Sequence, residues 1–310
     1  MPTPSRLSVL ASALTLLALA GCSKSNEGSA AAAASTAKYT VDLSPPYKVG
    51  QKFSVATDLS NTQHTTIVVT LPGMPTPQAQ KQDSETAAHI EADGEILGIF
   101  PNGSPQKVAL TLKNITATLN KAAVANLPAP GAKIIVEKSG ASATVSMDGQ
   151  PAADSIGRIL RDIFDTGNDK YTDQTMFGAK SPVAVGDSWP VDSTLLIASF
   201  KEGIGDVSNI AGTMKLTSLT GTGDSQVATV SGDVKIDGFK PPLPPGVTMT
   251  VDSSSGVLHV EGAIPAMDKG TEKESHSMTI KMEAHGDQQG AQLKISTSGE
   301  QKKTSVITFP

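Results

Sequence analysis

The sequence predicts a mainly β protein, in which a strongly curved antiparallel sheet or open barrel holds one amphipathic helix. β-favouring segments with alternating apolar and polar residues recur from Tyr39 onward, between Gly, Pro, Asn and Asp turn signals. The segment 151–166 has helical periodicity instead. The composition, with 18% charged residues, 28 Gly and 20 Pro in 310 residues, disfavours a helical bundle or a coiled coil. A two-sheet β-sandwich, or two similar β half-domains, is the alternative architecture.

The predicted strands are short segments bounded by turns. Alternation of apolar and polar side chains is clearest in 107–119, 272–283 and 290–298. A period of two places one face of a strand on a core and the other in water, as in antiparallel sheets. The candidate turns between strands are Asp93-Gly94, Asn102-Gly103, Asp148-Gly149 and Asp237-Gly238.

The segment 151–166 is the predicted helix. Its apolar residues recur at spacings of three and four, and they are Ile156, Ile159, Leu160, Ile163 and Phe164. Pro151 suits a first helical turn, and Gly167 suits the position after the last one. Because a helix with one apolar side must bury it, we expect this helix to pack across the concave face of the sheet.

A short motif occurs twice in the body of the chain. Residues 49–55 and 185–191 both match V-G-x-x-aromatic-x-V. The repetition suggests two halves, 39–150 and 180–310, arranged around the helix. A second, fainter match has a different offset, so coincidence is the alternative explanation.

The N-terminal part of the chain has the composition of a targeting segment followed by a linker. Within residues 1–21, a short positively charged start precedes an apolar run, Leu7 to Ala20, that is too short to span a membrane. The segment 22–38 is rich in small and polar residues and indicates a flexible linker. The β-rich body covers 39–310.

The end of the apolar run, Leu19-Ala20-Gly21-Cys22, resembles the lipobox of bacterial lipoproteins. This resemblance implies cleavage between Gly21 and Cys22, and attachment of lipid with fatty acids such as palmitate to Cys22. Ser23 replaces the Asp that commonly retains such proteins at the inner membrane, which implies an outer-membrane lipoprotein facing the periplasm. An ordinary secretory signal with a chance cysteine is the alternative. The V-G-x-x-W form of the repeated motif is also similar to uncharacterised envelope lipoproteins, which imply no activity.

Histidine–glutamate pairs two residues apart are the candidate metal ligands. The single cysteine excludes a Cys-based cluster. The pairs His259/Glu261 and Glu274/His276 each share one side of a strand, so together they would complete a Zn²⁺ or Cu²⁺ site if their strands were neighbours. Such pairs also arise by chance on polar strand faces, and we predict no metal and no cofactor.

Methionines in predicted strands are the candidates for lining a ligand site, namely Met249, Met278 and Met282. Their side chains are flexible and polarizable, and suit a surface that accepts varied apolar groups such as acyl chains. The alternative is that these methionines fill the core of a sheet with few aromatic residues.

The sequence gives no support to catalysis or to nucleic-acid binding. Gly186-Asp187-Ser188 could present a hydrolase nucleophile, but Pro190 follows closely and no G-x-S-x-G motif occurs. A net charge of −5 leaves no basic surplus for nucleic acid. We predict a non-enzymatic envelope protein that is held to the membrane through Cys22 and binds a lipid, an acyl chain or a protein partner in the periplasm. The alternatives are a structural or complex-forming lipoprotein without a ligand and, after it, a metal-dependent or hydrolytic enzyme.

Overall fold

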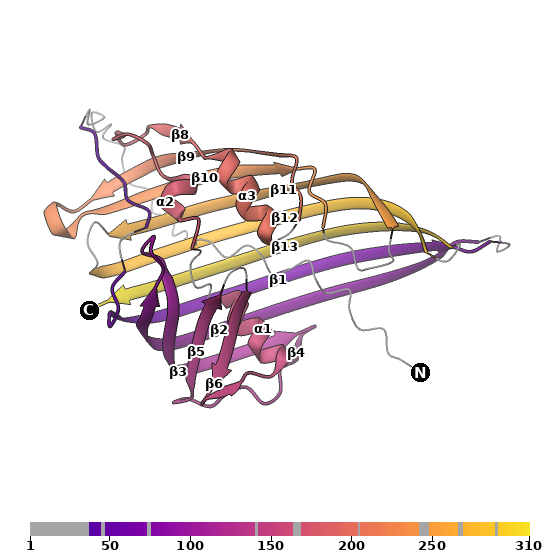
Figure 1. Cartoon of the computed structure of the whole chain (residues 1–310), viewed down its shortest axis with the longest axis horizontal. Coiled ribbons are helices and arrows are strands. Elements are labelled where there is room, and N and C mark those ends of the chain that lie inside the picture. The colour runs from indigo at the N-terminus through magenta and orange to yellow at the C-terminus, as the bar shows by residue number, and fades with distance from the viewer. Residues whose placement is uncertain are drawn as a thin grey trace, which may run out of the picture.

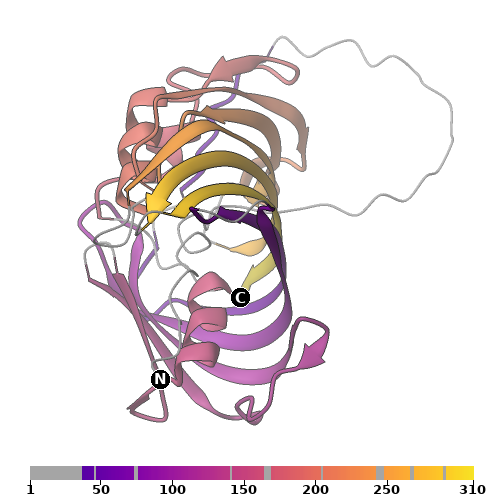
Figure 2. The same ribbon diagram turned by 90° about the vertical axis from the view of Figure 1, so that its right-hand side faces the viewer.

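The computed structural model describes residues 37–310 except 45–46, 73–75, 140–141, 164–168, 204, 242–247, 266–268 and 289–290. These residues form one antiparallel sheet of 13 strands, which is strongly curved and is not closed into a barrel (Figures 1 and 2). The predicted fold class is confirmed. Because the described strands belong to a single sheet, the chain does not adopt the alternative two-sheet sandwich.

The strands differ widely in length, from 2 to 22 residues. In chain order they are β1 (Lys52–Thr70), β2 (Gln78–Ile99), β3 (Pro105–Leu119), β4 (Ala122–Ala123), β5 (Lys133–Ser139), β6 (Ser142–Met147), β7 (Gln150–Pro151), β8 (Ser188–Pro190), β9 (Asn209–Thr220), β10 (Val227–Asp237), β11 (Thr248–Pro265), β12 (Gly270–Gln288) and β13 (Ala291–Phe309). The helices are α1 (Asp154–Ile163), α2 (Asp173–Phe177), α3 (Ser193–Gly203) and the short 3₁₀-helix η1 (Gly223–Ser225).

The first strand of the chain, β1, and the last, β13, lie side by side at the centre of the sheet. The strand order is β7-β6-β5-β3-β2-β1-β13-β12-β11-β10-β9-β8, and β4 pairs with β3. Strands that follow one another in the sequence are therefore almost always neighbours, and β1 pairs with β13 in the middle. The two edges are β7 and β8, and the connection between them contains α1 and α2. The N-terminal half of the chain thus builds one side of the curved sheet and the C-terminal half builds the other (Figure 1).

The central strands are much longer than the short segments expected from the sequence. β1, β2, β11, β12 and β13 contain 18 to 22 residues, whereas strands of five or six residues are usual. Asn102-Gly103 and Asp148-Gly149 form turns between strands as predicted, and Asp237 ends β10. Asp93-Gly94 was a wrong turn prediction, because both residues lie inside β2.

Gly94 is required by packing rather than by a turn. It pairs with Phe53 on β1. The Phe53 ring lies over Gly94 and occupies the space that a Cβ atom would need. A glycine in a strand interior often marks such a close approach.

The two copies of the repeated motif adopt the same turn, one before β1 and one before β8. The N–H groups of Gly50 and Gly186 donate to the carbonyl groups of Ile96 and Leu216, at 2.8 and 2.7 Å. Both glycines have positive φ, 83° and 97°, which favours glycine over other residues. The aromatic residues of the motif then enter the sheet at equivalent positions. The division of the body into two halves stays a prediction.

The predicted helix is present as α1, which is shorter than the expected range 151–166. Its apolar stripe faces the sheet, and Ile156, Ile159, Leu160 and Ile163 are all buried. α1 lies inside the curve of the sheet, as expected (Figure 2). Phe164 and Gly167 lie outside the described residues.

Two further helices were not predicted from the sequence. α3 has an N-cap at Asp192, whose carboxylate accepts a hydrogen bond from the Leu195 N–H at 3.2 Å. Its buried side chains, Leu196 and Phe200, are four residues apart and share one side of the helix. α2 is a helix of five residues with a capping box at Thr172. α2 is too short for an apolar stripe to be recognised in the sequence. α3 has 11 residues, but its apolar residues Leu195, Leu196 and Ile197 are consecutive, so they do not mark one side of a helix.

Candidate ligand-binding face

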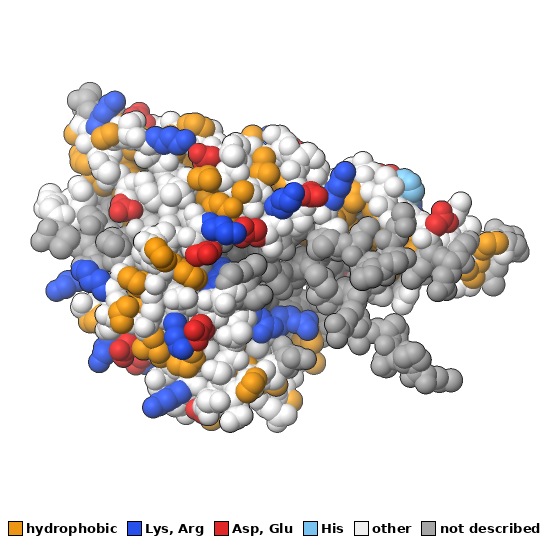
Figure 3. All heavy atoms as spheres, in the orientation of Figure 1, with side chains coloured by type: hydrophobic (Ala, Val, Ile, Leu, Met, Phe, Trp, Pro, Cys, Tyr) orange, Lys and Arg blue, Asp and Glu red, His pale blue; other side chains and the backbone are white. Residues whose placement is uncertain are grey.

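The concave face is the side of the sheet that carries α1, α2 and α3 (Figures 1 and 2). In Figure 3, which views the same side, acidic and basic side chains are interspersed with apolar ones. Buried residues on this face form two separate hydrophobic clusters. They are called here the C-terminal cluster and the N-terminal cluster.

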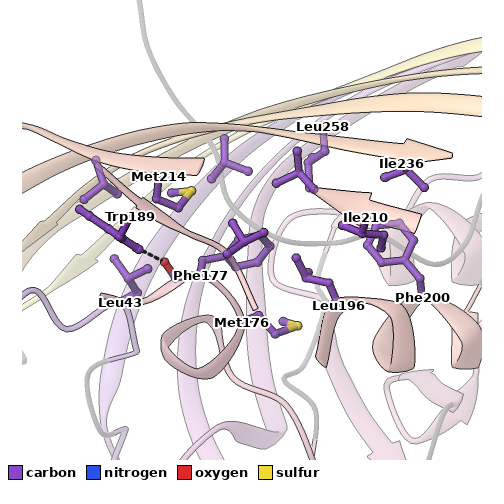
Figure 4. Close-up of a cluster of buried hydrophobic side chains, with 14 of the residues drawn as sticks. Leu43, Met176, Phe177, Trp189, Leu196, Phe200, Ile210, Met214, Ile236 and Leu258 are labelled. Atoms are coloured by element: carbon purple, nitrogen blue, oxygen red, sulfur yellow. Dashed lines mark hydrogen bonds between the residues drawn. The ribbon is translucent and has the colours of Figure 1, made fainter. Parts of the chain in front are cut away.

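The C-terminal cluster packs α2 and α3 against strands β8 to β11 (Figure 4). Its anchor is Trp189 on β8, which is 7% exposed. The indole Nε1–H of Trp189 donates to the carbonyl oxygen of Phe177 at 2.6 Å. This bond satisfies the polar atom of a buried tryptophan and fixes the end of α2 on the edge of the sheet. The N-terminal segment of the body joins this cluster through Val41 and Leu43.

The N-terminal cluster packs α1 against the N-terminal half of the sheet, on the same concave face. Leu160 lies at its centre and is fully buried. The same cluster includes Ile90 on β2, Leu110 on β3 and Ile134 on β5, which are at most 1% exposed. The cluster holds the helix firmly on the concave face, because each fully buried aliphatic side chain contributes about 1.5–3 kcal/mol.

A band of polar side chains lies between the two clusters, on β1, β12 and β13. The polar band consists of Thr57, Glu272, Glu274, His276, Lys303 and Ser305. These residues share one face, because Thr57 pairs with Ser305, Ser305 with Glu274, and Lys303 with His276 across the strands. The Thr57 and Ser305 hydroxyl groups are hydrogen-bonded at 3.0 Å. Buried ionisable groups are costly, so such a band calls for a physical or functional explanation.

The two glutamates of the band both have raised pKa values. Burial raises the pKa of Glu272 well above its usual range, and the nearby Glu274 and Asp173 carboxylates raise it further. Burial also raises the pKa of Glu274, while the positive charge of Lys303 opposes that rise. The two carboxyl groups are hydrogen-bonded to each other, which requires that one of them carry a proton. This hydrogen bond raises the pKa of Glu272 and lowers the pKa of Glu274, because Glu272 donates the proton and Glu274 accepts it.

The polar band extends toward Tyr47 and toward the first residue of α2. The carboxylate of Glu272, together with burial and the carboxylates of Glu274 and Asp173, raises the pKa of the Tyr47 phenol well above its usual range. The Tyr47 ring contacts Phe309 at the end of β13, with 6.1 Å between ring centroids. Acidic groups from β12 and α2 thus converge on one part of the concave face.

The three methionines predicted to line a ligand site share the concave face. Met278 and Met282 alternate with outward-facing residues on β12, on the same side as His276. Met249 on β11 pairs with Gly286, which continues the same side of β12. Met282 belongs to the C-terminal cluster, and Met278 packs against it. Contact of these side chains with a ligand stays a prediction.

The predicted metal-binding pairs lie on neighbouring strands but on opposite faces. Val260 on β11 pairs with His276 on β12, so His259 is turned to the other side of the sheet. His259 and Glu261 lie on the convex face, whereas Glu274 and His276 lie on the concave face. The four residues therefore cannot complete one site. In the described part of the chain, no three His, Cys, Asp or Glu side chains are placed to hold a metal ion.

The histidines of the convex face instead pair with aspartates across neighbouring strands. Their Nδ1 atoms lie 2.7 to 2.9 Å from Asp carboxylates, in the pairs His64–Asp83, His89–Asp58, His259–Asp233 and His285–Asp252. The hydrogen bond that His89 donates to Asp58 is the main reason that the pKa of His89 is raised, while partial burial opposes the rise. Glu91, two positions from His89, also lies near it, with 3.4 Å between Nε2 and Oε1. The closer carboxylate in each pair is the aspartate, which strand register places beside the histidine on the neighbouring strand.

The polar band is the feature that sequence analysis missed. Glu272 and Glu274 alternate with outward-facing residues in phase with Met278 and Met282. That phase already places these carboxyl groups on the apolar side of the strand, and is the signal that could have revealed the band. The partners on β1, β13 and α2 could not be identified, because their pairing depends on contacts between distant parts of the chain.

Several predicted features lie outside the described residues. These are the signal peptide 1–21, the cleavage position at Gly21 and Cys22, the lipid attachment at Cys22, and all but the last two residues of the linker 22–38. Within the described ranges, no helix has the length and apolar character needed to cross a membrane.

Comparison with known proteins identifies no family for this chain. No protein-family description and no curated protein matches the sequence. Among solved structures, a structure of lipovitellin concerned with lipid–protein interactions matches at 8% identity with a TM-score of 0.26, covering 80% of this chain and 25% of the lipovitellin chain. The P. putida toluene transporter TodX matches at 12% identity with a TM-score of 0.14, covering 86% of this chain and 93% of that one.

Proposed function

We propose that this protein is a non-enzymatic, lipid-anchored envelope protein that binds a lipid or acyl chain on the concave face of its sheet. The observation that carries the proposal is the apolar side of β11 and β12. There Met249, Met278 and Met282 lie on one face of an open sheet, where Met282 belongs to the C-terminal cluster and Met278 packs against it. Unbranched thioether side chains adapt to apolar groups of different shape, as a site for acyl chains requires.

The proposed anchor is a lipid on Cys22, in the outer membrane and facing the periplasm. Each buried methylene group of such a lipid contributes about 0.8 kcal/mol, and two or more chains make attachment stable. The linker to the body would have an end-to-end distance of roughly 22 Å if it behaves as a flexible coil. The body starts near the C-terminal cluster, where Tyr39 exchanges backbone hydrogen bonds of 2.7 and 2.9 Å with Val183. The concave face would therefore remain within reach of the membrane surface.

The binding proposal can be tested by photo-crosslinking of the full chain in its own membranes. The probe is a long-chain alkyl alcohol with a photoactivatable diazirine in the chain, and labelled residues are mapped by mass spectrometry. We expect labels on concave-face residues of β11 and β12. Replacement of Met278 by Gln should reduce this labelling about fivefold, because it removes about 1 kcal/mol of apolar contact.

The matched control is Thr279→Gln, the next residue of β12, which is exposed on the convex face. We expect labelling of this variant to equal that of the wild-type protein. Labels confined to the convex face, or equal effects of the two substitutions, would contradict binding on the concave face.

A further inference from the structure

Glu272, on the concave side of β12, has a buried carboxyl oxygen without a hydrogen-bond partner among the described residues. Its side chain is 2% exposed. The oxygen is the Oε2 atom. An unmet buried acceptor costs about 1–3 kcal/mol, and more when it carries charge. A donor supplied from outside the chain would remove that cost.

The charges around Glu272 favour a cationic donor. The carboxylates of Glu274 and Asp173 both disfavour ionisation of Glu272. The hydrogen bond with Glu272 has the opposite effect on Glu274, whose pKa it lowers. Among the described residues, Lys303 is the cation that favours ionisation in this group, and it acts on Glu274. A second positive group beside Glu272 would allow both glutamates to ionise. A primary ammonium supplies that charge together with three hydrogen-bond donors.

The surroundings of the acidic groups favour an amphiphile over a small polar amine. On the concave side of β12, Met278 lies four residues beyond Glu274, a distance of about 13 Å along a strand. Ile307, which pairs with Glu272, packs against the N-terminal cluster. A ligand with its ammonium group at Glu272 would therefore lie with the rest of its length on apolar side chains.

We propose that the polar band binds the primary ammonium group of an amphiphile, whose apolar chain extends along β12 toward Met278 and Met282. Glu272 accepts a hydrogen bond from the ammonium group, and Glu274 contributes a second negative charge. The inference rests on the proposed function, since it assigns the polar end of the same ligand.

The test compares three diazirine probes that have the same alkyl chain and differ in their polar end: an amine, an alcohol and a carboxylate. Each probe is titrated against the full chain in its own membranes, and labelling of β11 and β12 is measured. Glu272→Gln should raise the concentration for half-maximal labelling by the amine about tenfold or more, as expected for loss of a charged hydrogen bond. Glu274→Gln should act in the same direction. Labelling by the alcohol should be unchanged in both variants.

The control variant is Glu283→Gln, on the convex face of the same strand, where the carboxylate accepts a hydrogen bond from Ser296 at 2.6 Å. It should leave labelling by all three probes unchanged. Comparing variants with the same probe removes differences in membrane partition among probes, and the melting temperature of each variant reports whether it is folded. An unlabelled long-chain amine should compete with labelling by the amine probe. Ethylamine at the same free concentration should not compete.

The outcomes separate this inference from the proposed function. If the amine, alcohol and carboxylate label the concave face alike in wild type and in Glu272→Gln, the ammonium site is wrong and apolar binding stands. If ethylamine competes as well as the long-chain amine, the site binds free amines and the amphiphile is wrong. If none of the probes labels the concave face, the proposed function itself is wrong.

Discussion

Gly94 and Phe53 show how one pair of residues constrains the first strands of the sheet. The Phe53 ring occupies the space where residue 94 would carry a Cβ atom. We predict that Gly94→Ala destabilises the protein by about 1–3 kcal/mol, because overpacking outweighs the entropic gain of replacing glycine. The free energy of unfolding in urea measures this effect.

The matched control for this pair is Gly98→Ala in the same strand. An added Cβ there would meet its nearest neighbour, Lys107 Cβ, at the ordinary contact distance of 3.4 Å. We expect at most a small change in stability. Combining Gly94→Ala with Phe53→Leu should cost less than the sum of the two single changes, because the smaller side chain leaves room. Strict additivity would show that the ring is not the obstacle.

Glu272 should make stability depend on pH in a defined direction. Its pKa is raised in the folded protein, chiefly by burial, so the folded state holds its proton at pH values where the unfolded chain has lost it. This contribution is complete below the ordinary glutamate pKa of about 4.3 and is lost as pH rises through the raised pKa. Glu272→Gln cannot ionise. We therefore expect it to lose less stability than the wild type between about pH 5 and pH 8.

Urea unfolding at both pH values measures this difference. Tyr47, Asp173, Glu274, His276 and Lys303 also face this part of the protein, so a residual pH dependence is expected in the variant. Glu283→Gln on the convex face should follow the wild type. Parallel pH profiles for wild type and Glu272→Gln would refute a raised pKa at this position.

At the level of elements, α1 depends on its apolar stripe. Leu160 is fully buried between the helix and the sheet. We predict that Leu160→Ala lowers the free energy of unfolding by about 2–5 kcal/mol, the range for buried Leu-to-Ala changes. Arg158→Ala, on the exposed side of the same helix, should change it by less than about 0.5 kcal/mol. Equal effects measured by urea unfolding would mean that α1 does not pack as described.

The sequence predicted those elements well in which the periodic pattern of apolar residues extends over several residues. The stripe from Ile156 to Ile163 indicated α1, and alternation indicated the strands that became β3, β12 and β13. α3 was missed because its two buried contacts, Leu196 and Phe200, are too few to distinguish a helix from a strand. The sequence did not predict how long β1 and β2 are. Their polar segments are stabilised by backbone pairing, which does not require alternating apolar and polar side chains.

At the scale of the whole molecule, the proposed anchor and the folded body should be separable. We predict that Cys22→Ser abolishes incorporation of labelled fatty acid such as palmitate and yields an uncleaved precursor. The body should fold unchanged, because the described sheet starts at Lys52. Metabolic labelling and the electrophoretic mobility of the product measure both effects. Incorporation of label into the Cys22→Ser protein would contradict lipid attachment at this residue.

The candidate site could be predicted only in part from the sequence. Alternation placed Met278 and Met282 on one face of a strand, and the same alternation extends to Glu274. It could not show that Thr57 and Asp173 join that face, because they come from distant parts of the chain. Nor could it show that Lys303 does, because that depends on the register of the β12–β13 pair. Nor could it show that His259 faces away from His276, since a shift of one residue in register reverses a side chain.

The sequence by itself determined the local properties of this protein: β structure in the body, the helix at α1, and the Cys22 motif that predicts an anchor. These follow from periodicity and short motifs, which act over a few neighbouring residues. Only the tertiary structure decided that β1 pairs with β13 at the centre of the sheet, and that acidic groups lie between two hydrophobic clusters. The central pairing of β1 with β13 joins segments more than 200 residues apart, as in Thr57 and Ser305 with a separation of 248. No local pattern encodes such a pairing, because its free energy depends on both strands at once.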